Sequence, residues 1–504
     1  MLSFLVFITG ACVLIVEVVA VRFLSPYFGN TIFTVSSVIS VILAALSAGY
    51  YLGGKLSDRY PTRRLFFGVI FLSGCVLLIF YFLGLLVLPI LGTIFSFVIG
   101  PLISALSLFF VPALLLGTLS PFAVKLESID FPERGVGSVA GKIFFWSTLG
   151  SIFGGLSAGF FLIPNFGIDS IFIATSSVLF LVGFFALIMD GFNGAHLFSF
   201  FGVFIFFVVA ALFALFQLRT SLVYSKDGIY EKITIYEGEY NGRPARFFMQ
   251  DRSSSGAMFL DSDDPTDLVY EYTKYYSVYK LFDYDPQNIL VLGGGVYSIP
   301  KAFLVDLPGA IVDVSEVEPS LYDLAKEYFG LKDDPRLNNY IVDGRRLLQT
   351  SDKKFDLIFG DAYYSLFSVP AHFVTEEFFL LAKERLSDGG IFVGNFVGSL
   401  SDEGLSLTLS EMKTFRKVFP NSYFFVVDVG RKGVQNIIFL GLRGDAVINF
   451  NAIDGGDYEL KFIREKIIDI DKLDLSDQLV LTDNFSPVEY LTAKAIRDAK
   501  KNKF

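Results

Sequence analysis

The feature that most constrains this chain is a run of 58 residues, from Leu65 to Phe122, without one charged side chain. A run this long is typical of membrane-spanning helices, which need roughly 20 apolar residues each. It can hold two long helices or three short ones. We favour three segments, or a re-entrant piece, because the run is interrupted by Pro89, Gly92, Gly100 and Pro101.

Other apolar stretches of spanning length lie at 3–24, 32–54, 139–163, 168–190 and 196–218. Residues 1–220 hold only nine of the 41 basic and seven of the 51 acidic side chains. The sequence therefore predicts a multi-pass α-helical membrane bundle of 7–8 helices over 1–220, and an acidic, water-soluble region after it.

Charge predicts the orientation of the bundle. Lys55, Arg59, Arg63 and Arg64 follow the second span, so this loop and the N-terminus should be cytoplasmic. With three segments in 65–122 the crossings number eight, and the C-terminal domain is cytoplasmic. With two segments in 65–122 the crossings number seven, and the C-terminal domain lies outside the cell. We expect eight crossings of the plasma membrane, because a domain that uses a cytoplasmic cofactor needs the even count.

Several single features of the first 220 residues invite a structural interpretation. The apolar N-terminus suggests a retained first helix rather than a signal peptide. Cys12 and Cys75 both lie in apolar runs, so we expect neither a disulfide framework nor a cysteine-based metal site. Glu17 and Arg22 are more simply explained by an interfacial position than by catalysis. Small faces for close helix packing are offered by Gly49, Gly53, Gly54, Gly150, Gly154, Gly155 and Gly159.

The region after the spans divides into three predicted parts. Residues 221–286 alternate apolar and polar side chains around a turn at Asn241-Gly242, typical of a small β-hairpin region, and 265–282 read as a tyrosine-rich helix. Residues 287–445 alternate strands with helices, which indicates a doubly wound, Rossmann-like sheet. Residues 446–504 form a C-terminal extension.

Glycines and acids follow the successive strands of this predicted sheet. Open α/β sheets bind ligands at the carboxyl ends of their strands, so these residues should come together. An acid about 20 residues after a glycine-rich turn is suited to hold a ribose. The candidate nucleoside-binding residues are Gly293, Gly295, Glu316, Asp343, Gly344 and Asp361. For each acid alone, the simpler explanation is a solvated strand end or a helix N-cap.

The position of Asp343-Gly344 bears on the cofactor. A carboxylate after the third strand suits the amino group of an adenine, which favours an adenosyl-sulfonium cofactor over NAD. No basic side chain other than Lys301 adjoins residues 293–298 to pair with a cofactor carboxylate. This slightly favours decarboxylated S-adenosylmethionine over S-adenosylmethionine. We expect no metal.

These stretches resemble the spermidine synthase family of polyamine aminopropyltransferases, especially its membrane-fused members. The resemblance rests on 289–295, 316–319, 334–336 with 343–345, 355–361 and 375–379, and on Leu481-Thr-Asp-Asn-Phe-Ser-Pro-Val-Glu489 near the end. It implies that Gly293 and Gly295 back the sulfonium, Glu316 holds the ribose, Asp343 the adenine amine, and Asp361 the cofactor side. It further implies transfer of an aminopropyl group to an amine, with release of methylthioadenosine.

The chain departs from the family pattern where the amine is held. The family has an acid at the position of Val296, and its catalytic second acid is replaced here by Tyr364. The family's glutamine is not evident around 253–255. We therefore take Tyr364 and Tyr363 as the catalytic candidates, and expect Tyr297 and Phe367 to add to an aromatic acceptor side, with ordinary packing as the alternative. Substitute acids are Asp306, Glu376 and Glu377.

Three functions remain open. The first is a membrane-bound aminopropyltransferase of polyamine biosynthesis. The second is a methyltransferase or related enzyme acting on a membrane-associated substrate, and the third is a non-catalytic membrane sensor or transporter regulated by the nucleoside. The expected partners are the lipid bilayer and a small amine or membrane-associated acceptor, not a nucleic acid, since no basic patch appears. A homodimer is a further expectation.

Overall fold

The computed structural model describes residues 1–191, 202, 222–251, 253–282, 284–362, 370–400, 405–431, 433–448 and 463–501. The chain divides into two compact units, Met1–Ile233 and Thr234–Phe504. The finer domain boundaries expected from the sequence stay predictions. The expected span at 196–218 falls outside the described residues, apart from residue 202.

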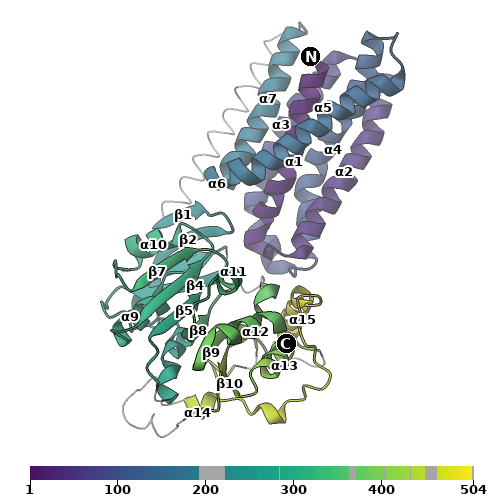
Figure 1. The fold of residues 1–504 in the computed structure, drawn as a ribbon. Coiled ribbons are helices and arrows are strands. Elements are labelled where there is room, and N and C mark those ends of the chain that lie inside the picture. Colours follow the sequence, from purple (N-terminus) through teal and green to yellow (C-terminus); the bar gives the residue numbers. More distant parts are fainter. Residues whose placement is uncertain are drawn as a thin grey trace. The chain divides into compact units, whose positions relative to one another are not determined.

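Six helices of the first unit are long and apolar enough to cross a membrane (Figure 1). They are α1 (Leu2–Phe28), α2 (Ile32–Arg59), α3 (Arg63–Ile94), α4 (Gly100–Asp130), the continuous run of α5 (Val136–Ser157), a π-helical turn (Ala158–Leu162) and α6 (Ile163–Asn165), and α7 (Ile168–Met189). Thr31 and Thr62 cap α2 and α3 by accepting hydrogen bonds from the backbone N–H three residues ahead.

The expectation of three segments between residues 65 and 122 was wrong. Two helices of 32 and 31 residues, α3 and α4, occupy this stretch. At 1.5 Å per residue each extends for nearly 50 Å, well beyond the ~20 residues assumed for one span. Pro89 lies inside α3 and does not end it. The chain turns instead at residues 95–99, before Gly100 and Pro101, where proline is tolerated in the first turn of α4.

Glycines bring three pairs of helices into backbone contact. A Cβ atom at Gly53 of α2 would overlap the Thr118 carbonyl of α4, and one at Gly154 of α5 would overlap the Ala11 carbonyl of α1. Gly74 of α3 meets the α7 backbone at Phe180 in the same way. Gly49 and Gly150 pack similarly, as expected, whereas a Cβ at Gly54 or Gly159 would meet nothing within 4 Å.

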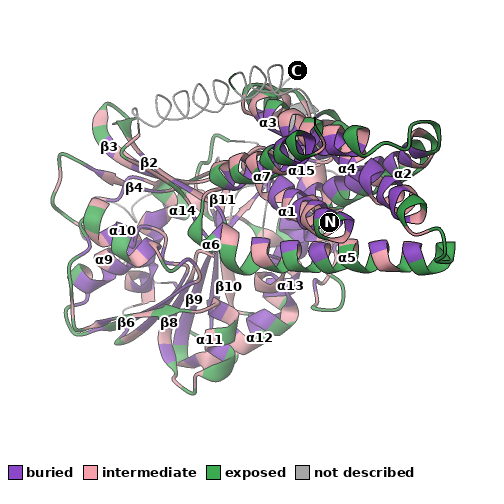
Figure 2. Cartoon of the chain, turned by 90° about the horizontal axis from the view of Figure 1, so that it is seen from above, coloured by how far each residue is buried: buried purple, intermediate pink, exposed green. Residues whose placement is uncertain are grey.

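The helices carry exposed residues, as the green stretches of α5 show in Figure 2, and many of these residues are large and apolar. On α5 these include Phe145, Ile152, Phe153 and Leu156, each more than half exposed. Contiguous apolar surface of this kind is unusual for a protein in water. It fits a helix that faces lipid.

Four strands follow the helices and form one sheet in the order β1-β2-β3-β4. They are β1 (Tyr224–Asp227), β2 (Lys232–Tyr240), β3 (Arg243–Gln250) and β4 (Ser253–Phe259). Asn241 and Gly242 join β2 to β3 with positive φ angles of 52° and 79°. Two such residues are typical of the tightest hairpin turn, so the predicted hairpin is confirmed. The tyrosine-rich segment Glu271–Phe282 (η2) is a 3-10 helix.

A seven-stranded sheet forms the centre of the second unit, in the order β10-β11-β9-β8-β5-β6-β7. The strands are β5 (Asn288–Leu292), β6 (Ile311–Glu316), β7 (Leu337–Ile341), β8 (Phe355–Gly360), β9 (Leu386–Gly398), β10 (Ser422–Val426) and β11 (Gln435–Leu442). The five strands β5 to β9 are parallel, and β10 and β11 add an antiparallel edge. The doubly wound fold is confirmed. Its switch point lies between β5 and β8, where ligands bind in such sheets.

Two apolar layers cover the faces of this sheet (Figure 1). The first contains η2 and α9 (Ser298–Asp306), with α10 (Leu321–Tyr328) beside it. The second contains α11 (Gly344–Thr350), α12 (Glu376–Arg385), α13 (Leu407–Val418) and α15 (Val488–Lys501). Short helices lie at Ala371–Phe373 (η3), Ile463–Lys466 (α14) and Ile470–Lys472 (η5). The sheet is therefore enclosed, which leaves its carboxyl edge for polar side chains.

Candidate functional site

The glycine loop after β5 is shaped by positive φ angles, 94° at Gly293 and 51° at Gly295. Side chains other than glycine are strained in this region. A Cβ atom at Gly293 would also overlap the backbone carbonyl of Asp361. Glycine at this position therefore lets the ends of β5 and β8 approach each other closely.

Glu316 at the end of β6 holds the glycine loop. Its Oε2 accepts hydrogen bonds from the backbone N–H groups of Gly294 at 2.8 Å and Gly295 at 3.1 Å, and its Oε1 accepts from Glu318 N–H at 2.9 Å. Burial raises the pKa of this carboxyl, and the three N–H donors oppose the rise. The predicted meeting of Glu316 with the glycines is confirmed, while its contact with a ribose stays a prediction.

Asp343 follows β7 and caps α11. Its Oδ1 accepts from the N–H of Arg346 at 3.0 Å, so the simpler N-cap role considered from the sequence is real. Its Oδ2 lies 3.1 Å from Nε2 of His372. Burial would raise the pKa of Asp343, but the hydrogen bonds from His372 and the α11 backbone lower it on balance. An ionised carboxylate has about four acceptor positions, so capping leaves room for an adenine amine.

Asp361 follows β8, is half-buried, and accepts hydrogen bonds from neutral donors. Asn395 Nδ2 of β9 donates to its Oδ1 at 2.8 Å, and the hydroxyl of Tyr272 in η2 also binds the carboxylate. Asn395 in turn accepts a hydrogen bond from Asn436 Nδ2 of β11 at 2.9 Å. Burial raises the pKa of Asp361 to about 6, although both donors favour the ionised form.

Four residues of the site were not predicted from the sequence: Tyr272, Asn395, Asn436 and His372. Asn395 offered a signal, since it lies in the strand after Asp361, near the carboxyl end of the sheet. Tyr272 could not be singled out from the other tyrosines of its segment, because a 3-10 helix lacks the periodicity from which we inferred a face. His372 follows a segment, 363–369, that lies outside the described residues.

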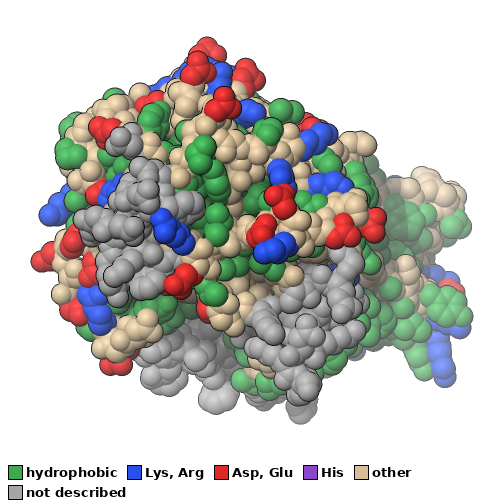
Figure 3. All heavy atoms as spheres, turned by 90° about the horizontal axis from the view of Figure 1, so that it is seen from below, with side chains coloured by type: hydrophobic (Ala, Val, Ile, Leu, Met, Phe, Trp, Pro, Cys, Tyr) green, Lys and Arg blue, Asp and Glu red, His purple; other side chains and the backbone are tan. Residues whose placement is uncertain are grey.

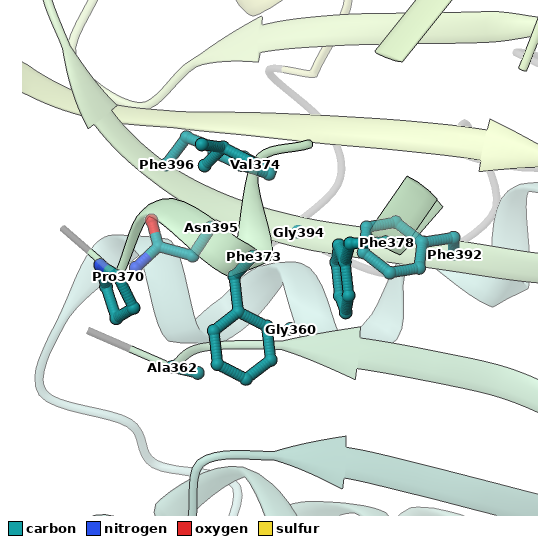
Figure 4. Close-up of a pocket in the computed structure, with 10 residues that line it drawn as sticks. All are labelled: Gly360, Ala362, Pro370, Phe373, Val374, Phe378, Phe392, Gly394, Asn395 and Phe396. Carbon is teal, nitrogen blue, oxygen red and sulfur yellow. The ribbon is translucent and has the colours of Figure 1, made fainter. Parts of the chain in front are cut away.

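A pocket lies at the carboxyl ends of β8 and β9, lined by Gly360 and Ala362, the two chain neighbours of Asp361 (Figure 4). Its walls are mostly apolar and include Phe373, Phe378 and Phe392, with Asn395 as a polar member. The rings of Phe378 and Phe392 lie close together, with centroids 6.3 Å apart. An apolar wall next to a half-buried carboxylate strengthens a charge interaction made by that carboxylate.

The expected place of Tyr297 on an aromatic acceptor side was wrong. Its side chain is fully buried, and its hydroxyl donates to Asn339 Oδ1 of β7 at 2.6 Å. Its φ angle of 59° turns the ring under the glycine loop, against Tyr322. The alternative, ordinary packing, is confirmed. The other members of the proposed acceptor side, Tyr363, Tyr364 and Phe367, lie outside the described residues.

The three substitute acids have other partners. Asp306 ends α9, away from the carboxyl edge where α9 begins, and binds Tyr279 and Lys280. Glu376 pairs with Lys417 at 2.7 Å, and Glu377 accepts from the N–H of Asp483 at 2.9 Å. The structure therefore gives no support for any of these as the missing acid.

Two further residues near the loop have apolar surroundings. Val296, which occupies the position of the acid in the family pattern, is buried and packs against Gly256 of β4. Lys301 donates a hydrogen bond to the Phe329 carbonyl, and burial lowers its pKa to about 8. Lys301 thus points to the backbone after α10 rather than to the glycine loop.

The described residues contain no group of three or more His, Cys, Asp or Glu side chains that could hold a metal.

A family model and several curated relatives are similar to the C-terminal part of this chain. Residues 273–440 match the Spermine/spermidine synthase domain. A polyamine aminopropyltransferase of Vibrio vulnificus is 24% identical over 231 residues, which are 45% of this chain and 74% of that protein. A probable polyamine aminopropyl transferase of Bifidobacterium longum is 31% identical over 142 residues, 28% of this chain and 31% of that protein.

Solved structures are also similar. The spermidine synthase of Thermotoga maritima superposes with a TM-score of 0.37 and 18% identity, over 56% of this chain and 87% of that one. Residues 273–440, which match the family model, contain Glu316, Asp343 and Asp361 together with the strands that carry them. This match shows that the C-terminal part of the chain carries a spermine/spermidine synthase domain.

Proposed function

We propose that this protein is a membrane-bound aminopropyltransferase of polyamine biosynthesis. Its co-substrate is decarboxylated S-adenosylmethionine, with S-adenosylmethionine itself as the alternative, and its acceptor is a small or membrane-associated amine. Glu316 holds the ribose, Asp343 the adenine amine, and the loop at Gly293 and Gly295 lies against the sulfonium.

The observation that carries this proposal is the half-buried carboxylate of Asp361. Its hydrogen-bond donors among the described residues, Asn395 and Tyr272, are neutral, so in this part of the chain no cation pairs with its negative charge. Withdrawing a charge from water without a counter-charge is costly. A sulfonium bound against the adjoining glycine loop would supply that counter-charge.

In the proposed reaction the acceptor nitrogen attacks the carbon bonded to the sulfonium. A C–N bond forms, the C–S bond breaks, and its electron pair neutralises the sulfur, so that methylthioadenosine leaves as a thioether. The nitrogen then loses a proton. We propose that Tyr364, at the position of the family's catalytic acid, orients the amine by a hydrogen bond. Its ordinary pKa of about 10 makes a tyrosine a weak base at neutral pH.

Methyl transfer is a second candidate, and Val296 favours it. An acid here would pair with the amine of the transferred group in the family pattern, but Val296 is buried against β4. In this case S-adenosylmethionine donates its methyl group to a membrane-associated acceptor, and S-adenosylhomocysteine is the product.

Calorimetry and product analysis on the detergent-purified full chain test these functions. We expect binding of decarboxylated S-adenosylmethionine and release of methylthioadenosine when a diamine is added. Release of S-adenosylhomocysteine from S-adenosylmethionine would favour the second candidate instead. Binding without turnover of any acceptor would support a sensor, and failure to bind any adenosyl ligand would refute the nucleoside site.

The expected cytoplasmic position of the C-terminal domain depended on three segments between residues 65 and 122, whereas this stretch forms two helices. At one end of the bundle, where α2 meets α3, Arg64 binds Asp190 at 3.1 Å. At the other end, Arg22 donates to the Gly228 carbonyl at 3.0 Å and Asp227 accepts from the N–H of Ile168 at 2.9 Å. Asp227 and Gly228, the last part of the first unit, therefore lie at the end of the bundle opposite Arg64.

Basic residues are concentrated at the Arg64 end. They are Lys55, Arg59, Arg63, Arg64, Lys125, Arg134 and Lys142, all within a few turns of helix ends at that side. By the positive-inside rule this end is cytoplasmic. We therefore propose that the bundle spans the plasma membrane and that the C-terminal domain faces away from the cytoplasm, where its co-substrate and acceptor must reach it.

Protease treatment of intact spheroplasts tests this orientation. We expect loss of a C-terminal epitope tag without lysis, while a tag fused before residue 1 stays protected. Protection of the C-terminal tag until lysis would overturn the orientation and restore the cytoplasmic domain.

A further inference from the structure

The C-terminal extension contributes a carboxylate to the surroundings of the nucleoside site. Asp483 accepts hydrogen bonds from both terminal nitrogens of Arg345, at 2.7 and 2.5 Å. Thr375, the N-cap of α12, donates to the same carboxylate at 2.8 Å. Two-pronged pairing of this kind fixes direction as well as distance.

Arg345 continues this contact toward the adenine side of the site. It follows Asp343 and Gly344 directly, and its Nη1 also donates to the backbone carbonyl of His372 at 3.1 Å. The ring of His372 then reaches Asp343 Oδ2 at 3.1 Å. A continuous series of hydrogen bonds thus joins Asp483 to the carboxylate that we assign to the adenine amine.

Burial makes this series dependent on Asp483. The Arg345 side chain is only 14% exposed, and a largely buried guanidinium needs an anionic partner. The hydrogen bonds from Arg345 hold the pKa of Asp483 below its usual range, so the carboxylate is charged at neutral pH. Nearby backbone bonds anchor the segment, since Glu376 N–H donates to the Leu481 carbonyl at 2.8 Å.

We propose that Asp483 is a positioning residue for adenine recognition: through Arg345 and His372 it fixes the carboxylate of Asp343 that accepts the adenine amine. This inference rests on the proposed function, because it assumes that an adenosyl group binds here. It assigns a role to the Leu481–Glu489 segment, which touches the site only through other residues.

The test separates adenine recognition from general support of the fold. Methylthioinosine carries an oxygen where methylthioadenosine carries the amine, so Asp343 should reject it. We measure the dissociation constants of both ligands by calorimetry on the full chain in detergent. Asp483→Asn should reduce the discrimination between them about tenfold, as expected for coupled neighbours. A role in folding alone would weaken both ligands equally.

The matched control is Asp471→Asn. Asp471 lies in the same C-terminal extension and pairs with Arg416 at 3.0 Å, but this pair is exposed. Its loss should leave both dissociation constants unchanged. If Asp483→Asn does not purify as a folded protein, Arg345→Lys keeps the charge, loses the two-pronged geometry and should show the same loss of discrimination.

The outcomes distinguish this inference from the proposed function. If the unaltered chain binds neither ligand, the nucleoside site itself is wrong and this inference falls with it. If it binds and discriminates, but Asp483→Asn discriminates equally well, Asp483 has no role in adenine recognition and only this inference is overturned.

Discussion

Lowering the pH from 7 to 5 should weaken binding of decarboxylated S-adenosylmethionine about tenfold relative to methylthioadenosine. Burial raises the pKa of Asp361 to about 6, so roughly nine-tenths of this carboxyl is ionised at pH 7 and roughly one-tenth at pH 5. A sulfonium that requires the ionised form loses affinity in proportion to that fraction. Methylthioadenosine is an uncharged thioether and lacks this requirement.

The ratio of the two dissociation constants, measured by calorimetry at pH 5, 6 and 7, isolates the effect of Asp361. In the proposed site, Glu316 and Asp343 hold parts that both ligands share, so their titration should cancel in the ratio. Asp361→Asn should give a ratio that is independent of pH. A ratio in the unaltered chain that stays constant between pH 5 and 7 would refute the pairing of Asp361 with the sulfonium.

Three further predictions concern other parts of the chain. Glu316→Ala removes the proposed ribose acceptor and also the carboxylate that holds the glycine loop. Calorimetry should show methylthioadenosine binding more than ~100-fold weaker, and unchanged affinity would show that the ribose lies elsewhere. Gly53→Ala pushes α2 away from α4, which should reduce the stability of the bundle by ~1–3 kcal/mol and lower its aggregation temperature in detergent. Gly54→Ala meets no neighbour and should leave that temperature unchanged, so equal effects of the two variants would contradict the close packing. Tyr297→Phe removes the hydrogen bond to Asn339 and should reduce the free energy of unfolding by ~1 kcal/mol, measured by thermal unfolding. The affinity for the nucleoside should not change; a change would show that Tyr297 belongs to the ligand site.

The hydrophobic pattern predicted the fold well where the structure of a segment depends on its own sequence. The strands β5, β6 and β8 could be predicted because each is a short apolar run that ends at, or is followed by, a glycine or an acid. The number of helices within residues 65–122 was mispredicted. The length of an apolar run indicates how many residues can lie in lipid, but not how many helices those residues form. Backbone contacts such as those of Gly53 could be anticipated as small faces, but their partner helices could not.

The candidate site was predictable to the extent that topology alone brings residues together. Glu316, Asp343 and Asp361 follow parallel strands, so their meeting follows from the order of the strands. Tyr272 binds Asp361 directly, and Asp483 acts through Arg345; both lie outside the β-α units, so no spacing rule connects them to the site. Tyr297 was misplaced because a single left-handed backbone angle turned its ring away from the loop surface.

The three-residue series from Asn436 through Asn395 to Asp361 links the antiparallel edge of the sheet to the site. Each amide donates toward the carboxylate, so replacing Asn436 would change how strongly Asn395 can donate. The acidity of Asp361 can thus be tuned from β11, two strands away, without altering a group assigned to the nucleoside. A substitution at Asn436 during evolution could therefore change the preference for charged over neutral ligands without replacing a residue assigned to the adenosine.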